Sequence, residues 1–210
     1  MANSTLNKLV SSGIVAVVRK IDPDKVTPLV DSLVAGGVTG IEITMNSKNS
    51  LEKISELKSK YGEQTVVGAG TVLNQKQAKE AIVAGADFIF APTLDRDTIE
   101  YTKREGKIMI PGAFTPTEIY QGYIWGADII KVFPASVLGP KFIKDIKGPL
   151  GEIQVMPTGG ISLNNIKSFF ETGSIAVGVG GSLVQSELIN QNKWEELEVL
   201  AKSFVESKLG

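Results

Sequence analysis

Short apolar runs alternate with helical stretches along the whole chain. The apolar runs are rich in Val and Ile and carry few charges, which is typical of parallel strands buried on both faces. Together they predict eight strands, over residues 14–18, 39–44, 65–70, 87–91, 107–110, 128–132, 153–157 and 175–179.

Two of the helical stretches have clear start signals. Thr115, Pro116 and Glu118 form a capping box with proline at the first helical position. Asn74 and Gln77 form a weaker version of the same box. These signals predict helices that begin directly after Thr115 and Asn74.

Other helices are predicted with fewer signals. They are expected near 4–12 and 193–207, and Ser162 is expected to begin another after a glycine pair. Pro28 lies inside a helical pattern, where proline removes a backbone hydrogen bond. The helix after the first strand is therefore expected either to begin near Thr27 or to kink at Pro28.

Eight strand–helix units without a linker predict a single domain over residues 1–210. The expected fold is α/β, a TIM (β/α)8 barrel with an N-terminal helix. A doubly wound open sheet is the alternative. It usually has a glycine-rich turn after its first strand, where this chain has Arg19 and Lys20.

A weak internal repeat supports the barrel. Four predicted strands follow a glycine turn, in the segments GVTGIE, GADFIF, GADIIK and GSIAVG, whose sixth residues are Glu42, Phe90, Lys131 and Gly178. Alternate strands of a barrel supply one layer of four inward side chains. Glu42 and Lys131 are therefore expected to face each other across the interior, where Gly178 leaves room.

Composition narrows the chemistry. The chain has 22 Lys and Arg against 23 Asp and Glu, which does not suggest a nucleic-acid partner. It has no Cys and no His, which excludes disulfides, a thiolate nucleophile, zinc held by Cys or His, and a Ser–His triad. Acid–base work falls to Glu, Asp, Lys or Tyr, and the nucleophile to Lys, Ser, Thr or a carboxylate.

The apolar runs of the sequence do not suggest a targeting signal. The apolar run Ile14–Val18 is too short for a signal peptide, and no stretch approaches the length of a membrane span. A cytoplasmic protein without a membrane partner is expected.

Lys131 is the first candidate for chemistry. It lies among apolar neighbours in IIKVFP, late in a predicted strand. Burial would lower its pKa, and a neutral lysine amine forms Schiff bases with ketones. The alternative is an outward lysine between helices, because Ile130 and Val132 must point opposite to Lys131. The repeat favours the interior.

Glu42, in GIEIT, is the second candidate. A buried carboxylate needs a partner, and Lys131 is the obvious one. Together they provide a nucleophile and a proton shuttle. The alternative is a structural ion pair that fills the barrel.

Two glycine-rich segments, at 157–162 and 178–182, follow the last two predicted strands. Loops at these places commonly bind phosphate in barrels, since backbone N–H groups can approach the oxygens closely. Ser182 can add a hydroxyl. Tight turns alone are the alternative, but two segments in the two expected places favour phosphate.

Weaker signals lie at other strand ends. Thr71 ends GAGT, Pro92 follows the fourth strand and Arg19 follows the first, so all three are expected at the active face. Structural turns explain Thr71 and Pro92 nearly as well, and Arg19 could be a solvated surface residue.

The segments GIEITMNS, GAGTVLN, APTL, IPGAFTPTE, IIKVFPA, PTGGIS and GVGGS run in this order from residue 40 to residue 182. This ordered set resembles the bacterial KDPG/KHG aldolases, which act on 2-keto-3-deoxy-6-phosphogluconate and 4-hydroxy-2-oxoglutarate. The resemblance covers nearly the whole chain. It implies a homotrimer that needs no metal and no cofactor.

The resemblance also implies residue roles. Lys131 would form the Schiff base and Glu42 would be the general acid–base. Thr71 and Pro92 would line the pyruvate end, with Phe133 packed on that pocket. The substrate pocket would also include Thr158, and phosphate would bind at Gly159, Gly160, Ile161, Gly180, Gly181 and Ser182. The implied reaction yields pyruvate and glyceraldehyde 3-phosphate.

One departure concerns the sugar epimer. Many gluconate-type members have arginine where this chain has Asn46, and Asn46 resembles the relatives that cleave the galactonate epimer. Arg19 matches an arginine of those relatives and of some gluconate enzymes, and is expected to bind the substrate carboxylate. Thr158 resembles the gluconate type, so both epimers stay open.

Two other function classes compete with the aldolase. Phosphate-binding barrel isomerases and synthases share the TGG and GGS segments, but they would not explain a lysine and a glutamate in one layer. A non-catalytic sugar-phosphate binder would use the same pocket without imine chemistry.

Overall fold

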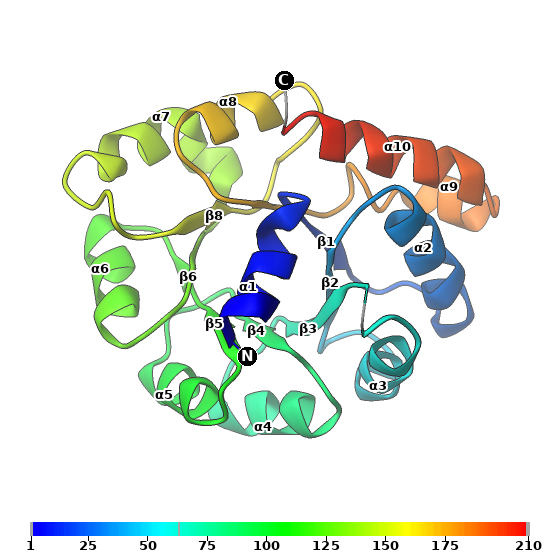
Figure 1. The fold of residues 1–210 in the computed structure, drawn as a ribbon, viewed down its shortest axis with the longest axis horizontal. Coiled ribbons are helices and arrows are strands. Elements are labelled where there is room, and N and C mark those ends of the chain that lie inside the picture. Colours follow the sequence, from blue (N-terminus) through cyan, green and yellow to red (C-terminus); the bar gives the residue numbers. More distant parts are fainter. Residues whose placement is uncertain (1, 63, 209–210) are drawn as a thin grey trace.

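Helices alternate with parallel strands in the protein, whose computed structural model describes residues 2–62 and 64–208. The helices surround the strands, and α1 lies across the middle of the view in Figure 1. The strands are β1 Ile14–Val18, β2 Gly40–Thr44, β3 Val66–Gly70, β4 Phe88–Phe90, β5 Ile108–Ile110, β6 Gly112–Ala113, β7 Ile130–Val132, β8 Val155–Pro157 and β9 Val177–Val179. The helices are α1 Ala2–Ser11, α2 Pro23–Ala35, α3 Ser50–Tyr61, α4 Gln75–Val83, α5 Arg96–Arg104, α6 Pro116–Ile124, α7 Ala135–Lys147, α8 Ile166–Glu171, α9 Ser186–Asn190 and α10 Trp194–Glu206.

The strands form a curled parallel sheet in two parts. Six strands pair in the order β5-β4-β3-β2-β1-β9, and three in the order β6-β7-β8. The predicted α/β class and all eight predicted strand positions are confirmed. One difference is that a further short strand, β6, follows β5. Pro111 separates the two strands, because proline has no N–H to donate to the sheet.

Two helix starts differ from the sequence prediction. The helix after β1 begins at Pro23, not near Thr27, and it contains Pro28. Proline suits the first helical turn, so Pro23 is the stronger start signal. Ser162 does not begin α8, which starts at Ile166 after a turn. Both capping signals are confirmed: the Thr115 box is complete, and the Asn74 side chain accepts from the Gln77 backbone.

Alternate residues of the strands fill the interior. A buried cluster joins the inward side chains of the strands to Leu9 of α1, so α1 covers the amino ends of the strands. The cluster consists of Leu9, Val15, Val66, Phe88, Phe90, Ile108, Ile110, Ile129, Met156 and Ala176. A larger apolar cluster lies between the strands and the surrounding helices. None of the described helices is long and apolar enough to cross a bilayer.

The glycine turns of the repeat lie beside two partly buried ion pairs, here called the aspartate clamps. Gly85 and Gly126 adopt φ of 101° and 96°, a conformation that favours glycine. The aspartate two residues later accepts from a lysine of a preceding helix: Asp87 from Lys58 at 2.8 Å, and Asp128 from Lys103 at 2.6 Å. Each aspartate also accepts a backbone N–H of the preceding strand, so it ties helix, turn and strand together.

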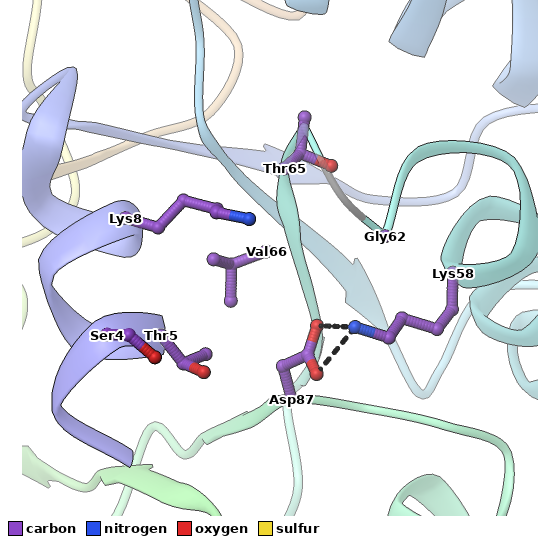
Figure 2. Close-up of a pocket in the computed structure, with 8 residues that line it drawn as sticks. All are labelled: Ser4, Thr5, Lys8, Lys58, Gly62, Thr65, Val66 and Asp87. Atoms are coloured by element: carbon purple, nitrogen blue, oxygen red, sulfur yellow. Dashed lines mark hydrogen bonds and ion pairs between the residues drawn. The ribbon is translucent and has the colours of Figure 1, made fainter. Parts of the chain in front are cut away.

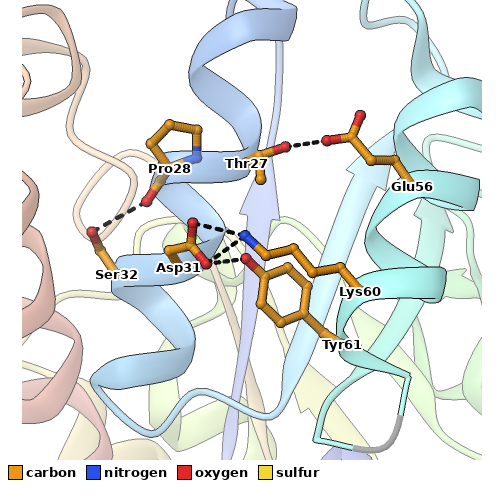
Figure 3. Close-up of polar contacts among 7 residues, drawn as sticks. All are labelled: Thr27, Pro28, Asp31, Ser32, Glu56, Lys60 and Tyr61. Atoms are coloured by element: carbon orange, nitrogen blue, oxygen red, sulfur yellow. Dashed lines mark hydrogen bonds and ion pairs between the residues drawn. The ribbon is translucent and has the colours of Figure 1, made fainter.

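Polar contacts join α2 to α3 at the surface (Figure 3). Asp31 accepts from Lys60 at 2.9 Å and from the Tyr61 hydroxyl, while Thr27 donates to Glu56. The sequence pattern did not predict these pairings, because they depend on how the two helices pack.

The Asp128 clamp yields a stability prediction. We expect Asp128→Ala to lower the free energy of unfolding by about 1.5–3 kcal/mol, because partly buried Lys103 and the Met109 N–H lose a charged partner. Glu100→Ala, which breaks the exposed pair with Arg96, should cost no more than about 0.5 kcal/mol. Urea unfolding followed by circular dichroism measures both. Equal effects of the two substitutions would contradict the prediction that the Asp128 clamp stabilises the fold.

Candidate active site

Glu42 and Lys131 both lie in the interior enclosed by the curled sheet. Glu42 is on β2 with none of its surface exposed, and Lys131 is on β7 with 3% exposed. The interior placement predicted for Lys131 is therefore confirmed, and the outward alternative is wrong. Gly70 provides the space for Glu42, since a Cβ at position 70 would lie 1.6 Å from Oε1.

The two groups are close enough to interact electrostatically but do not pair directly. Both carboxylate oxygens of Glu42 are buried, and neither has a hydrogen-bond partner among the described residues. The interpretation as a structural ion pair is therefore wrong. The hydrogen-bonding capacity of the carboxylate is left for another group.

Burial shifts both pKa values toward the neutral forms. It raises the pKa of Glu42 to about 7, although the charges of Lys131 and Arg19 oppose this. It also lowers the pKa of Lys131, against the attraction of Glu42 and with a further lowering from Arg19. The site therefore favours an uncharged amine, which is the nucleophilic form of lysine.

Two aromatic rings lie beside the lysine amine. The Lys131 Nζ lies 4.0 Å from the ring centre of Phe90 and 4.7 Å from that of Phe133. Phe133 was among the predicted site residues. Phe90 was placed only in the layer of four, so its contact with Lys131 was missed.

Arg19 and Thr71 meet at neighbouring strand ends. Arg19 Nη2 donates to the Thr71 hydroxyl at 3.3 Å, and Thr71 has the left-handed φ of 55°. Asn46, in the turn after β2, is exposed. Pro92 is partly buried, and its backbone packs where a Cβ at Gly112 would clash at 2.4 Å.

A cavity of about 360 Å³ opens beside these groups. The predicted site residues that line it are Arg19, Lys131, Phe133, Thr158, Gly159, Gly180 and Gly181. The prediction missed Val17, Ile21, Val184 and Ser186. Val17 had a usable signal, since strand alternation places it on the same face as Arg19. Glu42, Asn46, Thr71, Pro92, Gly160, Ile161 and Ser182 are outside this lining.

The two glycine segments differ in what they require. Gly160 has φ of 75°, and a Cβ there would lie 2.6 Å from the Ser136 Cβ, so local geometry already explains that glycine. At Gly180 and Gly181 a Cβ would meet nothing within 4 Å, so packing does not explain them. The Ser182 hydroxyl donates to the Ile161 carbonyl, which joins one segment to the other.

A second, smaller pocket of about 110 Å³ lies between α1 and the start of β3 (Figure 2). It contains none of the predicted site residues, and the Lys58–Asp87 clamp forms part of its wall. Within the described ranges, no cluster of three His, Cys, Asp or Glu could hold a metal ion.

A buried amine and a buried carboxylate beside a cavity define a site for covalent chemistry on a carbonyl compound. The family model described as KDPG and KHG aldolase matches residues 6–200. The chain therefore belongs to the KDPG and KHG aldolase family.

Individual relatives agree with this family. The chain is 32% identical to the 2-dehydro-3-deoxy-phosphogluconate aldolase of Haemophilus influenzae, over 96% of this chain and 95% of that protein. It is 28% identical to the 2-dehydro-3-deoxy-6-phosphogalactonate aldolase of Escherichia coli K12, over 92% and 95%. The KDPG aldolase of Legionella pneumophila, solved with pyruvate captured as a covalent carbinolamine intermediate, superposes with a TM-score of 0.85 at 26% identity, over 94% and 96%.

The buried carboxyl yields a pH prediction. Native Glu42 holds its proton up to about pH 7, whereas the unfolded chain releases it above about 4.5. This group therefore costs stability as pH rises between these values, by up to about 3 kcal/mol. We expect Glu42→Gln to gain stability relative to wild type between pH 5 and pH 8, measured by urea unfolding. Glu52→Gln, on the exposed face of α3, is the control and should show no such gain. If the free energy of unfolding of wild type and of Glu42→Gln changed in parallel with pH, the raised pKa of Glu42 would be refuted.

Proposed function

We propose that the chain is a class I aldolase that cleaves a 6-phosphorylated 2-keto-3-deoxy sugar acid through a Schiff base on Lys131. Family membership makes it a lyase. The observation that carries the proposal is the buried Lys131 amine, which lines the cavity without a hydrogen bond or ion pair to the described residues. An isomerase or a simple binder would need no such amine.

The reaction follows from the two buried groups. The Lys131 amine adds to the C2 ketone, and Glu42 helps the oxygen leave as water, which gives a protonated imine. This cation draws electrons from the C3–C4 bond while Glu42 accepts the C4 hydroxyl proton. Glyceraldehyde 3-phosphate leaves, and the enamine is protonated and hydrolysed to pyruvate.

The carboxylate of the keto acid is assigned to Arg19 and Thr71. Arg19 lines the cavity beside Lys131, and its guanidinium fork suits a carboxylate. Its hydrogen bond to Thr71 holds the two side chains next to each other. Pro92 and Phe133 form the wall around the pyruvate end. Asn46, which is exposed, contacts the substrate from the outer side of the site.

The phosphate is assigned to the two glycine segments. Gly159, Gly180 and Gly181 line the cavity together with Thr158. Gly160, Ile161 and Ser182 complete these segments, and the Ser182–Ile161 hydrogen bond holds them together. Open space at Gly180 and Gly181 allows phosphate oxygens to approach the backbone N–H groups.

The substrate class includes the gluconate and galactonate epimers, because relatives named for each match the chain at similar identity. We also propose one eight-stranded (β/α)8 barrel over the single domain 1–210. The bridge between Thr158 and Gly178, and the Lys131 N–H bond to the Pro111 carbonyl at 2.9 Å, support this closure. Assembly as a homotrimer rests on the resemblance, and a cytoplasmic location rests on the sequence pattern.

Borohydride reduction in the presence of pyruvate tests the Schiff base. We expect one pyruvate-derived adduct on Lys131, located by peptide mass mapping, because the neutral amine is poised to attack the ketone. Lys131→Arg should give no adduct, and exposed Lys141 should stay unmodified. An adduct on another lysine, or none, would reject the proposal.

Gly181→Ala tests the phosphate assignment. The new Cβ meets no protein atom, so the fold should be unaffected, but it narrows the approach to the backbone N–H groups. We expect KM for the phosphorylated substrate to rise roughly 10- to 100-fold, the range of hydrogen bonds to charged groups. Cleavage of an unphosphorylated analogue should hardly change.

Gly148→Ala, at the exposed end of α7, is the matched control and should leave both substrates unaffected. Equal losses on both substrates in Gly181→Ala would show that this glycine serves only the loop.

A further inference from the structure

Phe90 has no part in the reaction as described so far, yet its ring is the closer of the two aromatic rings beside the reacting nitrogen. The Lys131 Nζ lies 4.0 Å from the Phe90 ring centre, against 4.7 Å for Phe133. Both distances are within the range in which a π face attracts a cation. Phe90 is completely buried, so no water competes for its face.

The position of the Phe90 ring is fixed by its neighbours. Phe88 packs against it edge to face, with ring centres 6.5 Å apart and an angle of 78° between the planes. Gly68 makes room for Phe88, because a Cβ there would lie 2.4 Å from that ring. The face of Phe90 is therefore already in place before any charge forms on Lys131.

We propose that the face of Phe90 stabilises the positive charge that develops on the Lys131 nitrogen as the iminium forms. The proposal rests on the Schiff-base function above. The nitrogen lone pair forms the bond to C2, and one N–H proton passes to the former carbonyl oxygen. This oxygen takes a second proton from Glu42 and leaves as water, while the lone pair that the nitrogen regained makes the second C–N bond. The unit positive charge therefore appears on this nitrogen, and the negative charge is left on the Glu42 carboxylate.

This role differs from that of an apolar filler. An apolar wall would only desolvate the amine and disfavour every charged form of it. A π face also desolvates the amine but attracts the cation through the ring quadrupole. The face of Phe90 can therefore support the iminium cation inside a desolvated pocket, which an aliphatic side chain at position 90 would not do.

Fluorinated phenylalanines at position 90 separate the two roles. Adding one, two and three fluorines keeps the ring apolar and nearly the same size while it withdraws electron density from the face. We expect the rate of borohydride trapping at saturating pyruvate to fall stepwise, by roughly 2- to 30-fold over the series. The same series at Phe88, which is equally buried and has its ring against Phe90, is the matched control and should show no trend.

Each outcome has one meaning. A stepwise fall at position 90 alone supports the proposal. A flat series at position 90, or equal falls at both positions, overturns it. If the fluorinated proteins do not fold, as judged by circular dichroism, Phe90→Leu decides: a folded variant that traps at the wild-type rate overturns the proposal, and one that traps more slowly while thermal stability is kept supports it. Failure of the wild-type protein to be trapped on Lys131 would instead reject the Schiff-base function.

Discussion

The desolvation of one amine and one carboxyl in a common apolar interior is the constraint on which the rest of the structure depends. Glu42 has no hydrogen-bond partner among the described residues, and the Lys131 amine faces the rings of Phe90 and Phe133, so burying both groups costs free energy. The apolar side chains that the strands and α1 bury in the same interior stabilise the fold and offset this cost. Burial consequently shifts the pKa of both groups toward their neutral forms, which favours attack by the amine and proton transfer by the carboxyl.

Glycine determines where the functional side chains fit. Gly70 leaves the volume that Glu42 occupies, and Gly178 does the same for Thr158, whose hydroxyl would lie 2.4 Å from an added Cβ. Both glycines point inward on strands next to the residue they accommodate. The interior therefore holds polar groups because small residues face them, and a larger side chain at either glycine would clash with the polar residue beside it.

The sequence was sufficient for the strands and for the two central residues. The period of the apolar runs and the glycine-turn repeat placed Glu42 and Lys131 inside, because strand alternation is a local property. The start of α8 was not predictable in this way, since the turn before it depends on the Asn165 side chain, which bonds the Ser162 N–H and the Gly160 carbonyl. The contact of Phe90 with Lys131, and the absence of an ion pair with Glu42, depend on packing between strands far apart in the chain, which spacing alone does not encode.

The aspartate clamps lie at the opposite end of the strands from the proposed active site. Asp87 and Asp128 secure helix, turn and strand at the amino ends, whereas Arg19 and the glycine segments follow the carboxyl ends. Residues around the mouth of the cavity can therefore be exchanged without weakening the aspartate clamps between the strand–helix units. A scaffold divided in this way can change its sugar preference through substitutions at one rim, while the contacts at the other rim keep the fold intact.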